Sequence, residues 1–209
     1  MPYSNSQKTL VPQEIYHLYA RGVNKSGIFR EDYDYNLFCY LLKKYLTPKF
    51  KEYRLIQGQR VAIPVNTVSD KLELYAYCLM PNHFHLLVKN VEVDGVPALM
   101  RRVLSNYVKF FNNKYDREGP LIQGSYRGVR ITNEYQLIHV SRYIHLNPVK
   151  SGISKKAADY KYTSFHNYLK NRRTPWLCLH KRLIDSTDYS NIETYLKDIN
   201  EDKNLGITI

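Results

Sequence analysis

The sequence predicts an α+β protein: a ferredoxin-like sandwich in which helices pack on one face of an antiparallel sheet. Three observations support this. Strand-like and helix-like segments follow one another in the order β, α, β, β, α, β, α. Two of the strand-like segments are separated by only two residues, which favours an antiparallel hairpin. The chain has 209 residues, 44% of them hydrophobic, which is enough to bury a core of ordinary size.

The first half of the chain supplies a strand, a helix and a hairpin. Residues 14–22, EIYHLYARG, carry aromatic and β-branched side chains and end in a turn-forming glycine, as a strand does. In DYDYNLFCYLLKKYL, apolar residues recur at helical spacing until Thr47-Pro48 ends the helix. Residues 49–70 follow no clear period. LELYAYCLM (72–80) and HFHLLVKN (83–90) predict two strands joined by a turn at Pro81-Asn82.

The second half supplies two helices and a strand region between them. VPALMRRVLSNYVKFF has apolar residues along one helical face, and PLIQGSYRGVRIT contains short strand segments interrupted by glycines. Asn133 is placed to cap the next helix, with Gln136 three residues later as in a capping box. Because Pro148 follows, we expect this helix to end near Asn147. A short last helix is expected in DYSNIETYLKDI.

We expect residues 1–170 to form the main domain and residues 171–209 to form a basic extension whose role the sequence leaves open. The three cysteines form no C-x-x-C pair, so neither a disulfide framework nor a zinc knuckle is predicted. No apolar run is long enough for a membrane span and the first residues are polar, which predicts a cytoplasmic protein without a membrane partner. Both a monomer and a homodimer remain open.

The charge of the chain predicts a polyanionic partner. There are 31 Lys and Arg against 19 Asp and Glu, a net charge of +12 (31 − 19). The 20 tyrosines often lie beside basic residues, as in NYVKFFNNKY and GSYRGVR. Aromatic faces stack on unpaired bases while cations track phosphates, so single-stranded nucleic acid fits this pattern better than duplex. The alternative is a solvated basic surface with tyrosines that mostly pack against the core.

Two histidines on one predicted strand form the first candidate site. Side chains alternate along a strand, so His83 and His85 point the same way, with Cα atoms about 6.5 to 7 Å apart, while Phe84 points to the opposite face. Two imidazoles at that distance can converge on one metal ion. Two ligands do not make a site, however, and the alternative is a pair of ordinary histidines.

The stretch SRYIHLNPV supplies a candidate nucleophile and a third ligand. Tyr143 and Asn147 are four residues apart and therefore share one helix face, with His139 one turn earlier as a possible proton acceptor. A tyrosine hydroxyl beside an amide oxygen suits a nucleophile next to a metal ligand. Chance spacing on an amphipathic helix that Asn147 caps explains the same pattern, and a packed or surface role is the alternative for His139.

YCLMPNHFHLLV and SRYIHLNPVKSG together closely resemble the signature segments of the REP-associated tyrosine transposases, within the HUH superfamily of single-strand transposases. HUH stands for His, hydrophobic residue, His, here His83, Phe84 and His85. The resemblance spans roughly residues 14–170 and includes IYHLYARGVNKSGIFRED and GPLIQGSYRGVRI. The chain departs from the family in a longer segment at 47–71 and in its tail. The tail could be a DNA-binding element or a strap over the core around Trp176.

The resemblance implies the fold of an HUH nuclease and a metal-dependent enzyme that nicks single-stranded DNA and transfers strands, as in DNA transposition. Tyr143 would be the nucleophile that forms a covalent phosphotyrosine link, with His83, His85 and Asn147 as metal ligands. Hairpin-forming DNA is the implied substrate. Family members act with Mg²⁺ or Mn²⁺, whereas imidazole ligands by themselves favour zinc, copper or nickel, so zinc stays open.

We also expect DNA contacts from four basic residues that flank glycine turns at the edge of the predicted sheet: Arg21, Lys25, Arg127 and Arg130. Each could equally be a solvated surface charge. Three other functions compete with the transposase. One is a replication initiator or conjugative nickase with the same chemistry. Another is a noncatalytic basic module that binds single-stranded nucleic acid. The third is a metallohydrolase that uses a bound water.

Overall fold

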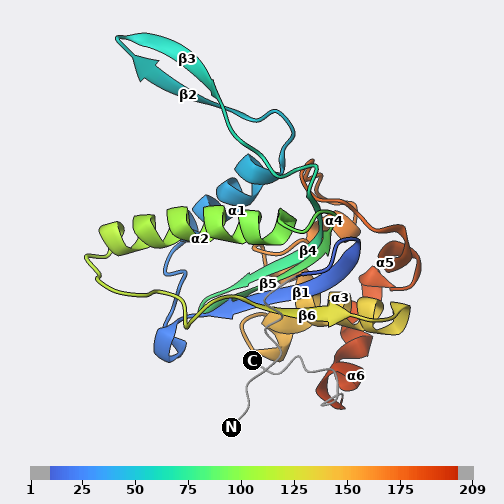
Figure 1. Ribbon diagram of the computed structural model, residues 1–209. Helices are drawn as coiled ribbons and strands as arrows, with labels where there is room; N and C mark the ends of the chain where they lie inside the picture. Colours follow the sequence, from blue (N-terminus) through green and yellow to red (C-terminus); the bar gives the residue numbers. More distant parts are fainter. Residues whose placement is uncertain (1–9, 202–209) are drawn as a thin grey trace.

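The computed structural model describes residues 10–201 and contains a four-stranded sheet in the order β4-β5-β1-β6 (Figure 1). The strands of this sheet are β1 (Glu14–Arg21), β4 (Leu72–Met80), β5 (His83–Asn90) and β6 (Arg127–Ile131). Each neighbouring pair is antiparallel. Apart from a separate hairpin, the elements that build the sheet follow the predicted β, α, β, β, α, β order, in a mixed α+β fold.

Helices cover both faces of the sheet, so the prediction of helices on one face is wrong. On one face lie α1 (Asp32–Leu46) and α2 (Gly95–Lys114), where the ring of Phe84 packs against Phe38 at 5.2 Å. On the other lies α3 (Glu134–Lys150), where His85 meets Tyr143 at 5.3 Å. The central strands show the reason: nearly every residue of β4 and β5 is buried, which requires cover on both faces.

Helix α3 begins as predicted and ends later than predicted. The side chain of Asn133 accepts a hydrogen bond from the backbone N–H of Gln136 at 2.8 Å, which confirms the predicted cap. The helix continues to Lys150, with Pro148 inside its last turn, so the predicted end near Asn147 is wrong. A proline this close to the end removes only one backbone hydrogen bond, and the N–H of Ser151 still reaches the carbonyl of Asn147 at 2.9 Å.

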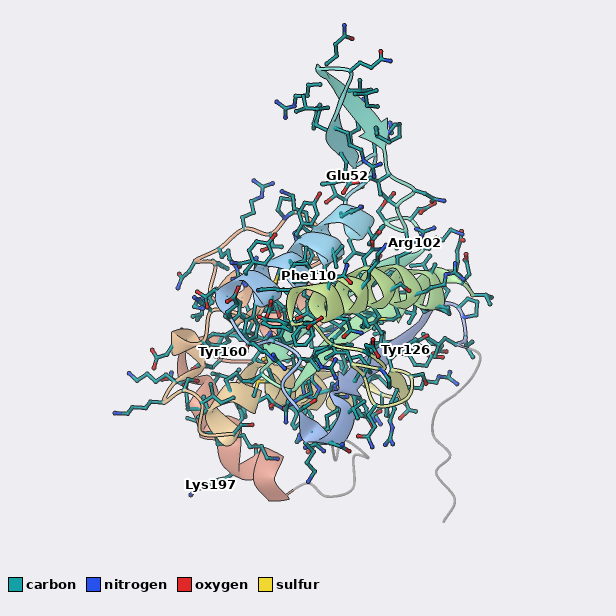
Figure 2. All side chains as sticks on the ribbon, turned by 90° about the vertical axis from the view of Figure 1, so that its left-hand side faces the viewer. Glu52, Arg102, Phe110, Tyr126, Tyr160 and Lys197 are labelled. Atoms are coloured by element: carbon teal, nitrogen blue, oxygen red, sulfur yellow. The ribbon has the colours of Figure 1, made fainter. Side chains whose placement is uncertain are left out.

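The segment that showed no clear period forms a projecting hairpin. Strands β2 (Lys51–Ile56) and β3 (Gln59–Pro64) pair only with each other and extend away from the end of α1 (Figure 1). Gln57 and Gly58 at its tip both have positive φ, 50° and 79°, as a tight two-residue hairpin turn requires. Figure 2 shows Glu52 at the base of this hairpin and the side chains beyond it standing off the body of the protein.

The C-terminal part of the chain forms a strap over the edge of β4. The backbone N–H of Cys178 donates to the carbonyl of Leu74 at 2.8 Å, and Thr163 forms a bridge with Cys78. Trp176 stacks on Tyr77 with ring centroids 5.6 Å apart. Of the two roles considered for the tail, these contacts match the strap, and they protect a sheet edge that would otherwise expose unpaired backbone groups.

Short helical segments complete the chain: η1 (Val23–Lys25), η2 (Ala157–Asp159), α4 (Phe165–Tyr168), α5 (Lys181–Asp185), η3 (Tyr189–Tyr195) and α6 (Leu196–Glu201). The predicted last helix is therefore split into a 3₁₀ segment and a short α-helix. Leu183 and Ile192 are fully buried and join the same core as the sheet. Within residues 10–201, no helix has both the length and the apolar character needed to cross a membrane.

Candidate active site

A buried polar cluster lies between the sheet and α3. His17 comes from β1, His83 and His85 from β5, and Tyr143 and Asn147 from α3. The rings of His83 and His85 are 5.0 Å apart, and the ring of Tyr143 stands edge-on to His85 at 5.3 Å. Nδ2 of Asn147 lies 3.2 Å from Nε2 of His85. The fold thus brings together the two segments that carried the sequence-based hypothesis.

Local geometry places these side chains as expected. Phe84 is fully buried against the α1 and α2 face, which turns its two histidine neighbours towards α3. Tyr143 and Asn147 are one helical turn apart, and a hydrogen bond joins their side chains. Both residues are largely buried, with Tyr143 9% exposed and Asn147 4% exposed. The candidate nucleophile therefore faces His85 and His17, not bulk solvent.

The hydrogen bonds assign the ring protons of both histidines. Nδ1 of His83 lies 2.6 Å from the side-chain oxygen of Asn82, which can only accept, so this nitrogen carries the proton. The amide of Asn147 donates to Nε2 of His85, so the proton of His85 is on Nδ1. Each ring therefore keeps an unprotonated Nε2, the form in which imidazole binds a metal ion.

Burial keeps both rings neutral. It lowers the pKa of His85 well below its usual value, and the neighbouring His17 and His83 lower it further. Burial likewise lowers the pKa of His83 to about 4, opposed by a hydrogen bond with Asn147 and assisted by the charge of Arg21. Because metal ions bind only deprotonated imidazole nitrogen, both histidines are in a ligand-competent state at neutral pH.

Burial shifts the pKa of Tyr143 in the direction opposite to that of the histidines. It raises the pKa of Tyr143 to about 12, with the hydrogen bond from Asn147 acting to lower it. The resting side chain is therefore a neutral phenol, and it needs positive charge nearby to become a good nucleophile. His139 is buried one turn earlier on α3, with its ring 6.2 Å from that of Tyr135, and its predicted role as proton acceptor stays a prediction.

The donor set suits a divalent cation that keeps oxygen ligands. The residues from 10 to 201 include no group of three or more His, Cys, Asp or Glu side chains arranged to hold a metal ion. The cluster here instead offers two imidazole nitrogens and the amide of Asn147, whose side chain contacts His83, His85 and Tyr143. Such a partial set leaves positions for phosphate and water oxygens, the ligands that Mg²⁺ and Mn²⁺ prefer.

His17 belongs to this cluster and was missed from the sequence. It is fully buried, and its Nε2 lies 2.8 Å from Nδ1 of His85. Its ring stacks on that of His85 with centroids 5.0 Å apart. The one available signal was a lone histidine within the first strand, but nothing local indicates that β1 pairs with β5.

The four basic residues that were predicted to contact DNA do not lie together: two are on the histidine face of the sheet, one is in an exposed turn and one is on the opposite face. Arg21 pairs in register with His83, and Arg127 pairs with Tyr19, which itself pairs with His85, so both arginines share the histidine face. Lys25 is exposed in η1 with a φ of 59°. Arg130 lies on the opposite face in an ion pair with Glu14. Arg21 alone is close enough to influence the pKa of His83.

Comparison with known proteins assigns the chain to a family. Residues 42–147 match the family model described as Transposase IS200 like. The chain is 30% identical over 168 residues to a protein of Haemophilus influenzae named as a REP-associated tyrosine transposase, covering 73% of this chain and 87% of that one. A solved REP-associated tyrosine transposase bound to a REP hairpin has the same fold, with a TM-score of 0.56 at 16% identity over 86% of this chain and 93% of that one. The protein therefore belongs to the IS200-like transposase family, and it is a distant homologue of the REP-associated tyrosine transposases.

Proposed function

We propose that the protein nicks single-stranded DNA and transfers the cut strand through a covalent link to Tyr143. The observation that carries this proposal is the convergence of Tyr143, Asn147 and His85 in one buried cluster. A tyrosine that lies against one neutral, ligand-competent histidine, with a second next to that histidine, has the surroundings that phosphoryl transfer to a phenol oxygen requires. Membership of the IS200-like transposase family supports the same reaction class.

In the cutting step, the phenol oxygen of Tyr143 forms a bond to phosphorus as the bond from phosphorus to the 3′ oxygen breaks. The phenol proton ends on the departing oxygen, so the products are a 5′-phosphotyrosine and a free 3′-hydroxyl. A second 3′-hydroxyl can attack the phosphotyrosine in the reverse sense and rejoin two strands. No ATP is consumed, because the phosphodiester is replaced by another phosphate ester of similar energy. The burial of Tyr143 limits access of water and favours transfer over hydrolysis.

His83, His85 and Asn147 would hold Mg²⁺ or Mn²⁺ in this proposal. When bound, such an ion withdraws electron density from a nonbridging phosphate oxygen and supplies the positive charge that Tyr143 needs. Asn147 has a second task, since it hydrogen-bonds to Tyr143 and so sets the direction of the phenol relative to His85. His17 accepts a hydrogen bond from Nδ1 of His85 and so fixes the tautomer of His85, which leaves its Nε2 unprotonated.

The proposed substrate is a hairpin-forming single-stranded DNA. Support comes from the net charge of +12 and from the relative of the same fold that was solved with a REP hairpin. Arg21 and Arg127 would guide the strand across the histidine face, and Lys25 would contact it from the exposed turn. Arg130, on the opposite face, would reach DNA only by giving up its ion pair with Glu14.

Covalent trapping tests the proposal. The full-length protein is incubated with labelled single-stranded hairpin DNA from the flanks of its own gene, with Mg²⁺, Mn²⁺ or Zn²⁺ in separate reactions, and the products are separated by denaturing electrophoresis. We expect a labelled band at the mass of the protein that is lost in Tyr143→Phe and His83→Ala. Tyr135→Phe is the matched control, because Tyr135 lies on the same helix and is 68% exposed.

Three outcomes would contradict the proposal. An adduct that persists in Tyr143→Phe would assign the nucleophile elsewhere. Tight, salt-sensitive DNA binding without an adduct in any metal would indicate a noncatalytic binding module. Strand cleavage that survives Tyr143→Phe and leaves no adduct would indicate hydrolysis by a bound water.

A further inference from the structure

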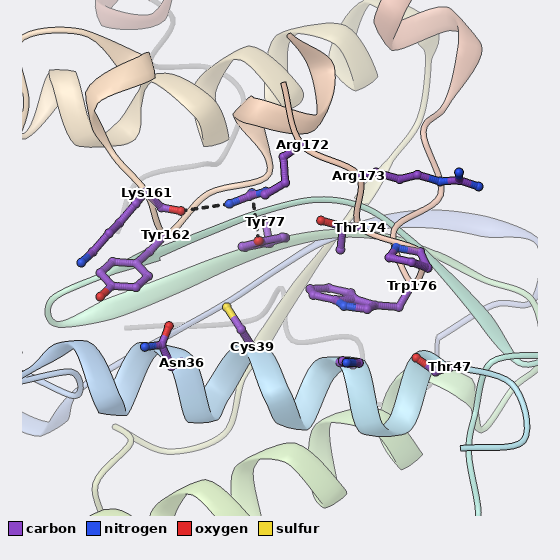
Figure 3. A pocket seen from close by; sticks show the side chains of 12 residues that line it. Asn36, Cys39, Thr47, Tyr77, Lys161, Tyr162, Arg172, Arg173, Thr174 and Trp176 are labelled. Atoms are coloured by element: carbon purple, nitrogen blue, oxygen red, sulfur yellow. Dashed lines mark hydrogen bonds between the residues drawn. The ribbon is translucent and has the colours of Figure 1, made fainter. Parts of the chain in front are cut away.

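A cavity of about 460 Å³ lies on the face of the sheet opposite Tyr143, between α1 and the strap (Figure 3). Tyr77 forms part of its wall and pairs in register with Leu86, on the same side of the sheet as Phe84. The cavity is therefore separated from the candidate active site by the sheet itself. Its volume is in the range of small-molecule and nucleotide pockets.

The lining of this cavity is basic and aromatic. It includes four cationic side chains and three aromatic rings, and no carboxylate: Lys43, Lys161, Arg172, Arg173, Tyr77, Tyr162 and Trp176. Cations without neighbouring acids favour an anionic ligand, and aromatic faces favour a planar one. Phosphate and base together satisfy both preferences, as in an unpaired nucleotide.

Two of the cations are engaged by the protein and two are available. Lys161 pairs with Asp32, and the guanidinium of Arg172 donates to the hydroxyl of Tyr77 at 3.2 Å and to the side-chain oxygen of Asn167 at 3.2 Å. These two residues build the wall. Lys43 and Arg173 are exposed, and within the described part of the chain neither takes part in an ion pair or a side-chain hydrogen bond. They are the two charges that a ligand phosphate can pair with.

The ring of Trp176 offers a surface for stacking, and the ring of Tyr77 packs against it and holds it in place. Its ring lies nearly parallel to that of Tyr77, with centroids 5.6 Å apart and an interplanar angle of 26°. The indole is only partly buried and lines the cavity, as Figure 3 shows. The cavity therefore has an aromatic surface on which a planar ligand can stack.

We propose that this cavity binds an unpaired nucleotide of the DNA substrate, with the base against Trp176 and the flanking phosphates on Lys43 and Arg173. The inference rests on the proposed function and adds to it a second point of attachment, on the face away from Tyr143. A site there holds a part of the strand other than the phosphate being cut. It fixes the DNA on the protein while the cut end remains free to move between partners.

The fluorescence of Trp176 tests this site directly, because Trp176 is the single tryptophan of the chain. The full-length protein is titrated in EDTA, which suppresses cutting, with an eight-nucleotide dT strand. We expect saturable quenching of Trp176. The double variant Lys43→Ala/Arg173→Ala should weaken binding about tenfold or more and reduce the slope of log affinity against log salt by about 1.4, the value for two phosphate contacts on a single strand. The variant should fold normally, since both side chains are exposed.

Arg101→Ala/Lys109→Ala is the matched control, because it removes one Arg and one Lys from exposed positions of α2 outside the cavity lining. Oligonucleotide binding seen by anisotropy with no change in Trp176 fluorescence would overturn the inference. So would equal quenching by dTMP, which would indicate a free-nucleotide site, or tighter binding of the matching rU strand, which would indicate RNA.

The adduct assay on the wild-type protein separates this inference from the proposed function. An adduct at Tyr143 without quenching of Trp176 fluorescence would contradict the cavity inference and leave the catalytic proposal intact. Quenching of Trp176 without any adduct would leave the cavity site and remove the catalytic proposal.

Discussion

Nε2 of His17 lies 2.8 Å from Nδ1 of His85, and both rings are fully buried. Because Asn147 donates to the far nitrogen of His85, the proton between the two rings belongs to His85, and His17 is the acceptor. The proton of His17 is then on its Nδ1, which has no hydrogen-bond partner among the described residues. An unsatisfied buried donor costs stability, about 1 to 3 kcal/mol. This cost makes sense if His17 serves to orient a metal ligand.

The first prediction concerns that orientation. His17→Leu removes the acceptor while keeping an apolar side chain of similar bulk, so His85 loses the bond that fixes its tautomer. We expect Mn²⁺ affinity to fall by about 10- to 100-fold, as measured by isothermal titration and by the electron paramagnetic resonance of free Mn²⁺. His17→Gln, which restores an acceptor, should recover part of the affinity. Unchanged Mn²⁺ binding in His17→Leu would show that the contact is only structural.

The second prediction concerns Asn147, whose side chain contacts both candidate ligands and the nucleophile. Asn147→Leu removes the amide and should reduce the single-turnover rate of adduct formation by about 100-fold or more. Asn147→Asp keeps an oxygen ligand and should retain more activity than Asn147→Leu, with tighter Mg²⁺ binding because of the added charge. Asn90→Leu, at another buried asparagine outside both the cluster and the cavity lining, controls for loss of stability. Equal rates in the wild type and Asn147→Leu would exclude Asn147 from the site.

The third prediction concerns stability against pH. Burial lowers the pKa of His145 from 6.5 to about 3, and its Nε2 lies 2.8 Å from the hydroxyl of Ser164. Between about pH 3 and pH 6.5, His145 carries a proton in the unfolded chain but not in the folded chain. The free energy of unfolding therefore falls as pH falls below about 6.5. One such histidine contributes a loss of about 2 kcal/mol between pH 7 and pH 5.

His145→Gln keeps a donor towards Ser164 but cannot titrate. Guanidinium unfolding at pH 7 and pH 5 should therefore show a loss of stability that is smaller in the variant by about 2 kcal/mol. The loss that remains belongs to the other buried histidines, such as His17. The same pH dependence in the variant and the wild type would show that His145 does not carry this part of the acid sensitivity.

The sequence predicted correctly those parts of the fold that depend on residues close together in the chain. The β4–β5 hairpin follows from two apolar runs and a two-residue turn, and the start of α3 follows from Asn133 and Gln136. The shared face of His83 and His85 follows from strand alternation alone. The pairing of His85 with Tyr143 in the candidate site was predicted only through a family resemblance, because no local rule brings β5 and α3 together.

The parts that it could not predict depend on contacts between distant segments. His17 entered the site through the pairing of β1 with β5, a partnership that strand propensity does not encode. The position of α3 on the second face depends on burial of the whole sheet, not on the pattern of α3 itself. Hairpin β2–β3 shows no alternation, because apolar and basic side chains share both of its faces. Apolar and polar residues alternate along a strand only where one of its faces is buried, and neither face of this hairpin is buried.

The last prediction follows from that exposure. Leu55 near the tip of the hairpin is 78% exposed, whereas Phe84 near the start of β5 is fully buried between the sheet and α1. Leu55→Ser should change the free energy of unfolding by no more than about 0.5 kcal/mol, while Phe84→Ala should reduce it by about 3 to 5 kcal/mol through lost burial and a cavity. Urea unfolding followed by circular dichroism measures both. A loss of more than about 1 kcal/mol in Leu55→Ser would show that the hairpin packs against the body or against a second copy in solution, since an exposed side chain free of contacts has little stability to lose.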